Sequence, residues 1–356
     1  MFLFVDYTYP EGPRHILPLL SLLLFNIDPN NPEKCFLAFR LISVYACYIP
    51  IVDTSKPIAT IDEEERLDYE TASGFEDFVL QFLDKIFSFI DHSSLELVRL
   101  ENSAGGEKSK LEKVTETVVY NVCMVLLMQI NDAIFKKALE KLCTYITERI
   151  LEIKVAGQLA AGLCRVFAQV NGKETLQTLL PVLSQTILDI TGESSDIIKD
   201  EHVDDRLLHT MLLLSATVHT TGNNLLPYID TLITVLDRVV ILNSREGNNL
   251  ACILLKAILQ SLSSMIPYHF TSTEGIRYWG QVMDINTLKV KWYIPGKDEM
   301  AAINRIFLKY LIPEANKLET YCKDWSTLTR LIVTSTIFNE SIHYISVRYY
   351  KIMMHL

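Results

Sequence analysis

Residues 75–90 read FEDFVLQFLDKIFSFI, and their apolar side chains recur at helical spacing over four turns. The apolar positions follow the i, i+3, i+4, i+7 pattern of one helix face. They are Phe75, Phe78, Val79, Phe82, Leu83, Ile86, Phe87 and Ile90. Because polar residues fill the opposite side, this helix must bury a wide apolar stripe against neighbouring helices.

The same spacing recurs in two stretches further along the chain. One contains Leu226, Ile229, Leu232, Ile233, Leu236 and Val240. The other contains Leu250, Ile253, Leu254, Ala257, Ile258, Ser261, Leu262 and Met265. Each stretch predicts an amphipathic helix that docks on its neighbours through one face.

Prolines interrupt the helical pattern at a regular interval, since Pro181, Pro227, Pro267 and Pro313 stand 46, 40 and 46 residues apart. Proline is tolerated in the first turn of a helix and ends a helix when it comes later, so these prolines are predicted to mark helix boundaries. An interval of about 40–47 residues that holds two helices is typical of HEAT and armadillo repeats. One such pair cannot bury its own stripe, and stacked pairs form a continuous core. The sequence therefore predicts an all-α fold, an α-solenoid of HEAT-like helix pairs.

The predicted organisation has five parts. They are a helix pair over residues 1–52, an acidic flexible loop over 53–72, HEAT-like repeats over 73–270 with a loop at 101–113, an aromatic-rich excursion over 271–297, and a further helix pair over 298–356. Within the excursion, residues 288–292 alternate and predict a short strand, and Trp279, Trp292 and Tyr293 are expected to pack over the helices. Both ends of the chain lie in apolar helical patterns, so we expect a part of a longer repeat array.

Composition narrows the function and the compartment. The formal net charge of the 356 residues is −10, which argues against a nucleic-acid binder that neutralises phosphates. Seven cysteines form no Cys-x-x-Cys pair, and their positions predict buried thiols in a reducing compartment, the cytoplasm and nucleus. The apolar segment 16–25 is too short to span a bilayer, so a buried helix is favoured over a signal peptide and no membrane association is expected.

The motifs of enzyme chemistry are missing from the sequence. Gly172-Lys173 is followed by Glu174, and Phe167 stands where a phosphate-binding loop needs its earlier glycine. The Gly-x-Ser-x-Gly and His-Glu-x-x-His patterns do not occur either. We therefore expect no enzyme, no catalytic residue and no bound cofactor.

One group of residues has the side-chain types of a zinc site: His202, Asp204, Asp205, His209 and His219. Their spacing matches no compact metal motif. Because the aspartates stand where a helix is predicted to begin, they are better explained by the positive end of that helix. We therefore expect no metal.

A second group could hold a phosphate or stack a base: Arg277, Lys289, Lys291 and Lys297, interleaved with Trp292 and Tyr293. The favoured interpretation is that these lysines lie on the solvated side of a packed strand. Gly157 and Gly162, within a predicted helix, are expected to permit close helix packing.

Ordered strings along residues 15–325 resemble a known family. They are Phe36-Leu37-Ala38-Phe39-Arg40-Leu41-Ile42-Ser43, Ile49-Pro50-Ile51-Val52-Asp53, residues 75–85, residues 155–165 (VAGQLAAGLCR), Leu207-Leu208 through Leu214-Ser215, residues 250–255 (LACILL), Trp279-Gly280 and Trp292-Tyr293-Ile294-Pro295. Together these strings resemble the proteasome activator complex subunit 4 family, of whose long chain they cover a minor part.

The resemblance implies a HEAT-repeat dome that caps the 20S core proteasome without ATP and promotes hydrolysis of peptides and poorly folded proteins. It also implies a link to acetylated histones, DNA repair and spermatogenesis, and inositol phosphate binding at openings of the dome, for which Lys289 and Lys291 are the candidate contacts here. The family's hydrophobic-Tyr-x docking tail has no counterpart at Met354-His355-Leu356. The acetyl-lysine region of the family has no counterpart in this sequence either. Because the docking tail is missing, this chain alone is not expected to activate the proteasome. The alternative is a generic HEAT-repeat scaffold or transport adaptor.

Overall fold

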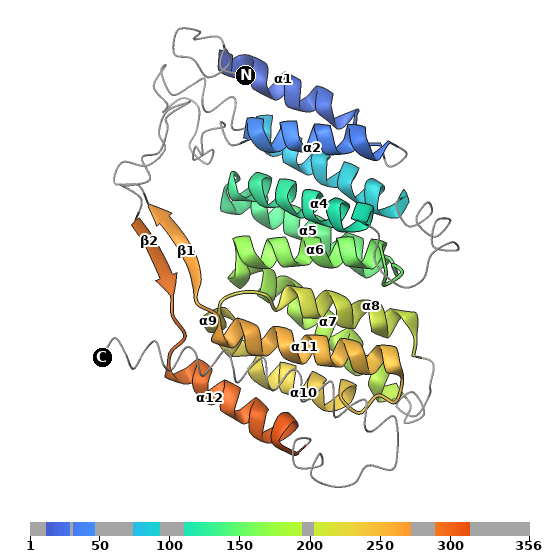
Figure 1. Cartoon of the computed structure of the whole chain (residues 1–356), viewed down its shortest axis with the longest axis vertical. Helices are drawn as coiled ribbons and strands as arrows, with labels where there is room; N and C mark the ends of the chain where they lie inside the picture. Colours follow the sequence, from blue (N-terminus) through green and yellow to red (C-terminus); the bar gives the residue numbers. More distant parts are fainter. Residues whose placement is uncertain are drawn as a thin grey trace. The chain divides into compact units, whose positions relative to one another are not determined.

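The computed structural model describes residues 12–28, 31–46, 74–92, 110–193, 203–271 and 289–313. These residues form helices joined by short turns, together with one two-stranded sheet (Figure 1). The chain divides into two compact units. Unit 1 comprises Met1–Val170 and His269–Lys291, and unit 2 comprises Asn171–Tyr268 and Trp292–Leu356.

The helices of unit 1 alternate between two layers. Their bounds are α1 Gly12–Leu24, α2 Pro32–Ala46, a helix over residues 74–92, α4 Lys110–Met128, α5 Asp132–Glu148 and α6 Ala156–Val170. In layer A, α4 lies between α2 and α6 and packs on both (Figure 1). In layer B, the helix over residues 74–92 is hydrogen-bonded to α5. Each pair of successive helices thus contributes one helix to each layer, as HEAT repeats do.

The core of unit 1 is rich in aromatic side chains from residues 75–90. All eight apolar residues of that stripe are buried, as predicted. Phe82 lies with its ring centroid 6.3 Å from that of Phe39 on α2 and 6.2 Å from that of Phe78. The ring centroids of Phe135 on α5 and Phe167 on α6 are 5.3 Å apart. Rings from both layers therefore interlock in one core.

Unit 2 repeats the two-layer arrangement. Its helices are α7 Gly172–Glu193, α8 Asp205–Thr217, α9 Gly222–Leu225, η3 Leu226–Tyr228, α10 Ile229–Val239, α11 Arg245–Ser263, α12 Lys297–Ile306 and the π-helical turn η5 Phe307–Leu311. In layer A, α8 packs on α11, and the Ser261 hydroxyl donates a 2.7 Å hydrogen bond to the Val218 carbonyl. In layer B, α10 lies against both α7 and α12. Every residue of α8 from Leu207 to Thr217 is buried.

Polar side chains begin several helices, as helix-capping chemistry requires. The Asn131 side chain accepts from the Ile134 amide at the start of α5, and Ser244 does the same for Gly247 at the start of α11. Gly172, at the start of α7, permits a close approach, because a Cβ there would lie 1.9 Å from the Thr220 hydroxyl oxygen. Among the described helices, none is long and apolar enough to cross a membrane.

The all-α prediction is confirmed in class, and one strand prediction holds. Residues 289–293 form β2 (Lys289–Tyr293), one residue later than the predicted strand. Its partner β1 (Ile266–Thr271) was not predicted, because Pro267 was taken to end a helix. In fact α11 ends at Ser263, and Pro267 lies within a strand of a two-stranded sheet, where both strands are edges that tolerate proline.

The prediction that prolines mark helix boundaries is wrong at Pro181. Pro181 lies inside α7, whose Leu179, Leu180 and Leu183 are buried, so packing outweighs the lost backbone hydrogen bond. The helix starts vary in spacing as well, since α5, α7 and α10 begin at Asp132, Gly172 and Ile229, 40 and 57 residues apart. Pro227 does fall at the beginning of the η3–α10 segment, as expected.

Three smaller expectations are also corrected. The loop predicted over 101–113 ends sooner, because α4 begins at Lys110, where Lys, Leu and Glu are strong helix formers. Ile253 and Met265 are exposed and do not belong to the buried stripe of α11. A Cβ on Gly162 would meet nothing within 4 Å, so this glycine is not required for close packing. The acidic loop over 53–72, most of the excursion and the second helix expected over 298–356 lie outside the described residues.

Candidate functional site: polar clasps between stacked helices

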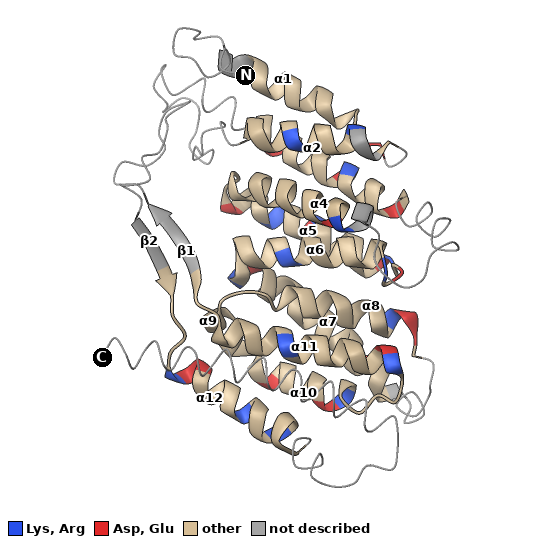
Figure 2. Cartoon of the chain, viewed as in Figure 1, with Lys and Arg blue, Asp and Glu red and all other residues tan. Residues whose placement is uncertain are grey.

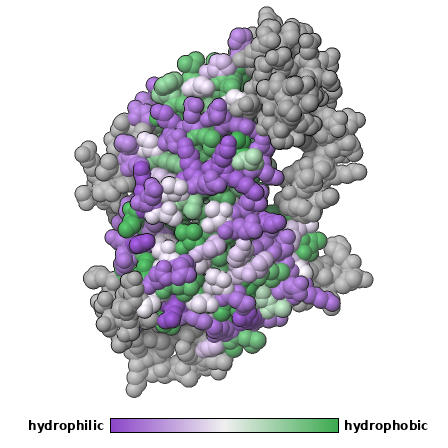
Figure 3. All heavy atoms as spheres, turned by 180° about the vertical axis from the view of Figure 1, so that it is seen from behind, coloured by the Kyte–Doolittle hydropathy of each residue, from purple (hydrophilic) through white to green (hydrophobic). Residues whose placement is uncertain are grey.

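Charged side chains occur in both layers of unit 1. In layer A, those of α4 lie between Lys110 and Glu116, and α6 carries only Arg165. In layer B, the helix over residues 74–92 and α5 carry acidic and basic side chains in most turns (Figure 2). The face opposite to that of Figure 1 accordingly shows broad hydrophilic bands (Figure 3). The interhelical ion pairs described below lie in layer B.

In unit 1, five side chains join the helix over residues 74–92 to α5, and we call this group the unit 1 clasp: Asp84, Asp91, Lys141, Tyr145 and Arg149. The Lys141 ammonium lies 2.6 Å from Asp84 Oδ1, and the Arg149 guanidinium donates to Asp91 Oδ2. Both ion pairs are partly exposed, so screening by water limits each to about 0–1 kcal/mol.

Tyr145 is the buried centre of the unit 1 clasp. Its hydroxyl lies 2.9 Å from Asp91 Oδ1 and 3.4 Å from the Phe87 carbonyl oxygen, one acceptor on each side of a single proton. The Phe87 ring stacks on the Tyr145 ring at 4.3 Å, and the Arg149 guanidinium carbon lies 5.0 Å from the same ring. Burial raises the pKa of the Tyr145 hydroxyl above its ordinary value, so it remains a hydrogen-bond donor.

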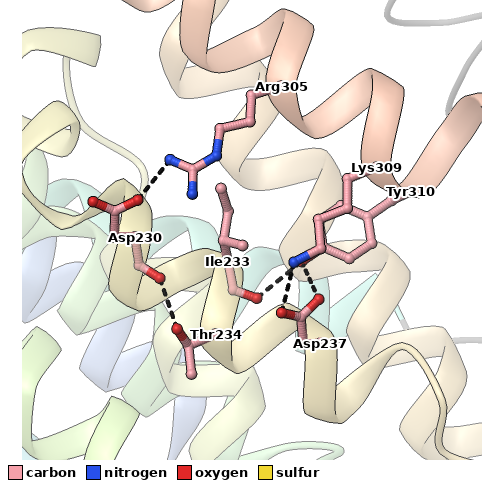
Figure 4. Close-up of polar contacts among 7 residues, drawn as sticks. All are labelled: Asp230, Ile233, Thr234, Asp237, Arg305, Lys309 and Tyr310. Carbon is pink, nitrogen blue, oxygen red and sulfur yellow. Dashed lines mark hydrogen bonds and ion pairs between the residues drawn. The ribbon is translucent and has the colours of Figure 1, made fainter.

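In unit 2, five side chains join α10 to α12 and η5 in the same way, and we call them the unit 2 clasp: Asp230, Asp237, Arg305, Lys309 and Tyr310 (Figure 4). Arg305 lies 2.6 Å from Asp230, and Lys309 lies 2.7 Å from Asp237. The Tyr310 hydroxyl lies 2.8 Å from Asp237 Oδ1 and 2.9 Å from the Ile233 carbonyl oxygen. Burial, and then the Asp237 carboxylate, raise the pKa of Tyr310 above its ordinary value.

The two clasps share one geometry. In both, a tyrosine hydroxyl donates to an aspartate and to the backbone carbonyl four residues before that aspartate. A second aspartate, seven residues before the first, forms an ion pair with a basic side chain. The ion-paired residues are 57 and 58 positions apart in unit 1 and 75 and 72 apart in unit 2. This arrangement fixes which turns of neighbouring layer B helices face each other, because only one register satisfies both aspartates.

A separate polar junction in unit 2 is centred on Glu299, in the first turn of α12. The Tyr293 hydroxyl donates a 2.6 Å hydrogen bond to Glu299 Oε1, and the Gly296 amide donates a 2.8 Å bond to Oε2. Tyr293 in turn accepts from the Asn223 amide at 2.8 Å. Gly222 must be glycine here, because a Cβ would lie 2.8 Å from both the Glu299 side chain and the Tyr293 hydroxyl.

The Glu299 carboxylate remains ionised despite its burial. Burial by itself raises the pKa of Glu299, but hydrogen bonds from Tyr293 and from backbone amides outweigh it and lower the pKa below its ordinary value. The junction therefore ties β2 to the start of α12 and to α9 through a charged, fully hydrogen-bonded carboxylate.

The two kinds of contact in the unit 1 clasp are expected to contribute unequally to the free energy of unfolding. Replacing Tyr145 by phenylalanine removes a buried hydroxyl between two acceptors and is expected to lower the free energy of unfolding by about 1–2 kcal/mol. Replacing Lys141 by methionine removes only an exposed ion pair and is expected to cost less than about 1 kcal/mol. Urea unfolding of both variants checks this, and a larger loss for Lys141→Met would contradict the central role of Tyr145.

The metal candidates within the described residues form no metal-binding group. Asp204 caps α8 by accepting a 2.9 Å hydrogen bond from the Arg206 amide, and Asp205 lies in the first turn, which confirms the helix-end interpretation. His209 is buried within α8, and His202 lies outside the described residues. In the described part of the chain, no group of three His, Cys, Asp or Glu side chains could hold a metal ion.

The candidate anion site lies only partly within the described residues. Lys289 and Lys291 lie on β2, Lys297 begins α12, and Arg277 lies outside the described residues. Trp292 does not pack over the helices as expected, since it is 55% exposed. Tyr293 does pack, but its hydroxyl faces the Glu299 carboxylate, which would repel an anion.

Neither clasp was predicted from the sequence, and the Glu299 junction was not predicted either. The available signals were local: Asp84 and Asp91, and likewise Asp230 and Asp237, are seven residues apart on the polar side of a helix. Glu299 stands at the third helical position after Gly296, which is the position of a capping glutamate. The prediction of buried thiols is confirmed for Cys35, Cys123, Cys164 and Cys252, whereas Cys143 is half-buried.

Comparisons with known proteins agree with the two-layer arrangement of helix pairs. Residues 1–348 match the family model described as proteasome activator complex subunit 4, mid HEAT repeats region, which confirms the predicted HEAT-type solenoid class. The chain is 32% identical over 336 residues to proteasome activator complex subunit 4B of Danio rerio and 33% identical over 327 residues to subunit 4 of Xenopus laevis. It is 32% identical over 330 residues to subunit 4 of Homo sapiens.

These alignments cover 88–90% of this chain but 18% of each relative, so the chain spans about a fifth of their length. The match nevertheless extends over nearly all of the helix pairs described above. The chain therefore belongs to the proteasome activator complex subunit 4 family and corresponds to its mid HEAT-repeat region.

Proposed function

We propose that this chain is a non-enzymatic, ATP-independent segment of a proteasome activator that contributes wall and partner surface to a cap on the 20S core proteasome. The observation that carries the proposal is the match of residues 1–348 to the mid HEAT-repeat region of the family. The stacked helix pairs support it, because repeat arrays present extended surfaces without needing a catalytic pocket.

The clasps give the proposal a physical basis. A cap has to hold its shape while substrates enter, and an array of helix pairs bends most easily where neighbouring helices slide. In each unit, the layer B clasp opposes such sliding because it satisfies both aspartates in one register only. The segment is therefore proposed to keep the cap rigid and to contact its partners.

The partners and location follow from the same proposal. We propose the 20S core proteasome as partner, with peptides and poorly folded proteins, including acetylated histones, as substrates of the complete activator in the cytoplasm and nucleus. No cofactor is proposed for the segment itself. Inositol phosphate binding is proposed as well, with Lys289 and Lys291 as the candidate contacts in this chain.

A chimera tests the proposal. Residues 1–348 of this chain replace the matching segment of the human relative, and the chimera is mixed with purified 20S core proteasome in ATP-free buffer. We expect a shifted band on native gels and faster cleavage of a fluorogenic peptide, as with the unaltered human protein. A chimera that folds but neither shifts the band nor accelerates cleavage would contradict the proposed role.

The matched control carries a HEAT-repeat segment of equal length from an unrelated scaffold in the same place. This control is expected to fold and to leave peptide cleavage at its basal rate. If the control activates as well as the chimera, the segment acts as a generic spacer. The scaffold alternative would then describe it better.

A further inference from the structure

Helix α6 carries a narrow stripe of residues that the packing of unit 1 does not bury. Ten of its fifteen residues are buried. Four of the others are Gln158, Gly162, Arg165 and Gln169, which follow one another at spacings of four, three and four residues. Residues at these spacings lie in one line along the surface of a helix. We call these four residues the α6 stripe.

Gly162 leaves open space in the middle of the α6 stripe. A glycine inside a helix lowers the stability of the helix, and packing does not require one here, because a Cβ on Gly162 would meet nothing within 4 Å. Glycine is also the residue that allows the backbone of another molecule to approach most closely. The open space next to Arg165 is therefore suited to an approaching backbone.

Arg165 brings a positive charge to the α6 stripe. It is exposed, and within the described part of the chain it forms no ion pair, whereas Lys141 and Arg149 of the unit 1 clasp do. Helix α6 has no acidic residue, and residues 117–128 of α4, which packs on α6, have none either (Figure 2). The guanidinium therefore remains available to a carboxylate from outside the chain, which it can bind through two parallel hydrogen bonds.

The two glutamines at the ends of the α6 stripe offer both kinds of hydrogen-bonding group. Gln158 Nε2 donates a 3.3 Å hydrogen bond to the Ile153 carbonyl, which leaves the side-chain oxygen of Gln158 as an acceptor. Gln169 Oε1 accepts from the Tyr120 hydroxyl, which leaves the side-chain nitrogen of Gln169 as a donor. A peptide backbone has N–H donors and C=O acceptors to match both, whereas a fully ionised phosphate has acceptors only.

We propose that the α6 stripe binds an extended acidic peptide segment of a partner protein, with Gly162 admitting the peptide backbone and Arg165 binding a carboxylate. From Gln158 to Gln169 the stripe is about 16 Å long, which an extended peptide spans with about five residues. The carboxylate belongs near the middle of that segment. This binding site does not depend on the proposed function, because peptide binding is measured without the proteasome.

A peptide library with a fixed central aspartate tests the charge. Nine-residue peptides are selected on the full chain, and the Kd of each selected peptide is measured by fluorescence anisotropy. We expect Arg165→Gln, or asparagine in place of the central aspartate, to weaken binding at least about tenfold, because a charge-assisted contact is lost. Arg40→Gln is the matched control, since Arg40 is exposed on α2 of the same layer, and it should leave the Kd unchanged.

Two outcomes of this experiment would overturn the proposal. One is that no selected peptide binds with a Kd below about 100 µM. The other is that the Kd of the selected peptides is the same for the Arg165→Gln chain as for the unaltered chain, or rises equally in the Arg40→Gln chain.

Gly162→Ala tests the open space, and its two expected effects have opposite signs. The urea midpoint should rise, because alanine favours the helix and its methyl group meets nothing. Peptide binding should weaken at least about fivefold, because the methyl group occupies the space that the peptide backbone needs. Gly192→Ala on α7 is the matched control, since a Cβ there also meets nothing within 4 Å, and it should leave binding unchanged.

Because the Gly162→Ala chain is expected to be more stable, weaker binding cannot be ascribed to unfolding. Unchanged peptide binding by this chain would overturn the proposal. Tripolyphosphate, added at constant ionic strength, distinguishes a peptide site from a site for small anions. We expect it to leave the peptide bound, and displacement of the peptide would overturn the proposal in favour of an anion site.

Discussion

Replacing Phe82 by alanine is expected to lower the free energy of unfolding by about 3–5 kcal/mol, the largest effect of any single substitution considered for this chain. Phe82 is 1% exposed, and its ring meets Phe39 and Phe78 at 6.3 and 6.2 Å. Truncation removes the ring contacts and leaves a cavity that the flanking rings, held in two layers, cannot fill by a small shift.

Urea unfolding followed by far-UV circular dichroism measures this loss. The matched control is Phe25→Ala, because Phe25 is 78% exposed in the same unit and should cost less than about 0.5 kcal/mol. Similar losses for the two variants would show that the aromatic core described for unit 1 is not the main source of its stability.

Replacing Glu299 by alanine is expected to cost about 2–3 kcal/mol, because the Tyr293 hydroxyl and the Gly296 amide both lose their acceptor. Glu299 is 6% exposed, so water can replace the carboxylate only poorly. The loss should appear in unit 2, where hydrogen exchange of β2 and of the first turn of α12 should quicken. Asp298→Ala, in the same turn but exposed, is the control and should cost little.

The pH dependence of the Glu299 contribution has a definite sign. Because the pKa of Glu299 is lower in the folded chain than its ordinary value of 4.5, the unfolded chain takes up the proton first as the pH falls. The carboxylate's contribution is therefore complete at neutral pH and declines below about pH 4.5. We expect the stability difference between the chain and its Glu299→Gln variant to shrink over that acid range. A difference that stays constant down to pH 3 would contradict the ionised junction.

Much of the fold was predictable from local periodicity. The stripe from Phe75 to Ile90 is buried as a whole because its eight apolar residues define one face unambiguously. The predicted strand before Tyr293 also formed, since alternation of Lys with apolar residues is a two-residue pattern. Its partner β1 was missed because strand pairing depends on a distant segment and Pro267 suggested only an ending.

The two clasps could not be predicted from local sequence patterns, and the reason is physical. Asp91 and Tyr145 are 54 residues apart, and Asp237 and Tyr310 are 73 apart, so only the stacking of helices brings them together. An aspartate on the polar face of a helix has the same sequence signature whether it faces water or a tyrosine. The irregular turn at η5 likewise has no signal of its own in the sequence.

The unit 2 clasp closes over a longer stretch of chain than the unit 1 clasp, 75 residues against 57 for the first ion pair of each. Because the entropy of closing a loop grows only with the logarithm of its length, the additional residues oppose closure by merely about 0.2 kcal/mol. A protein built in this way can acquire new segments between successive helix pairs almost without penalty. The β1–β2 segment, which lies between α11 and α12, is such an intervening segment.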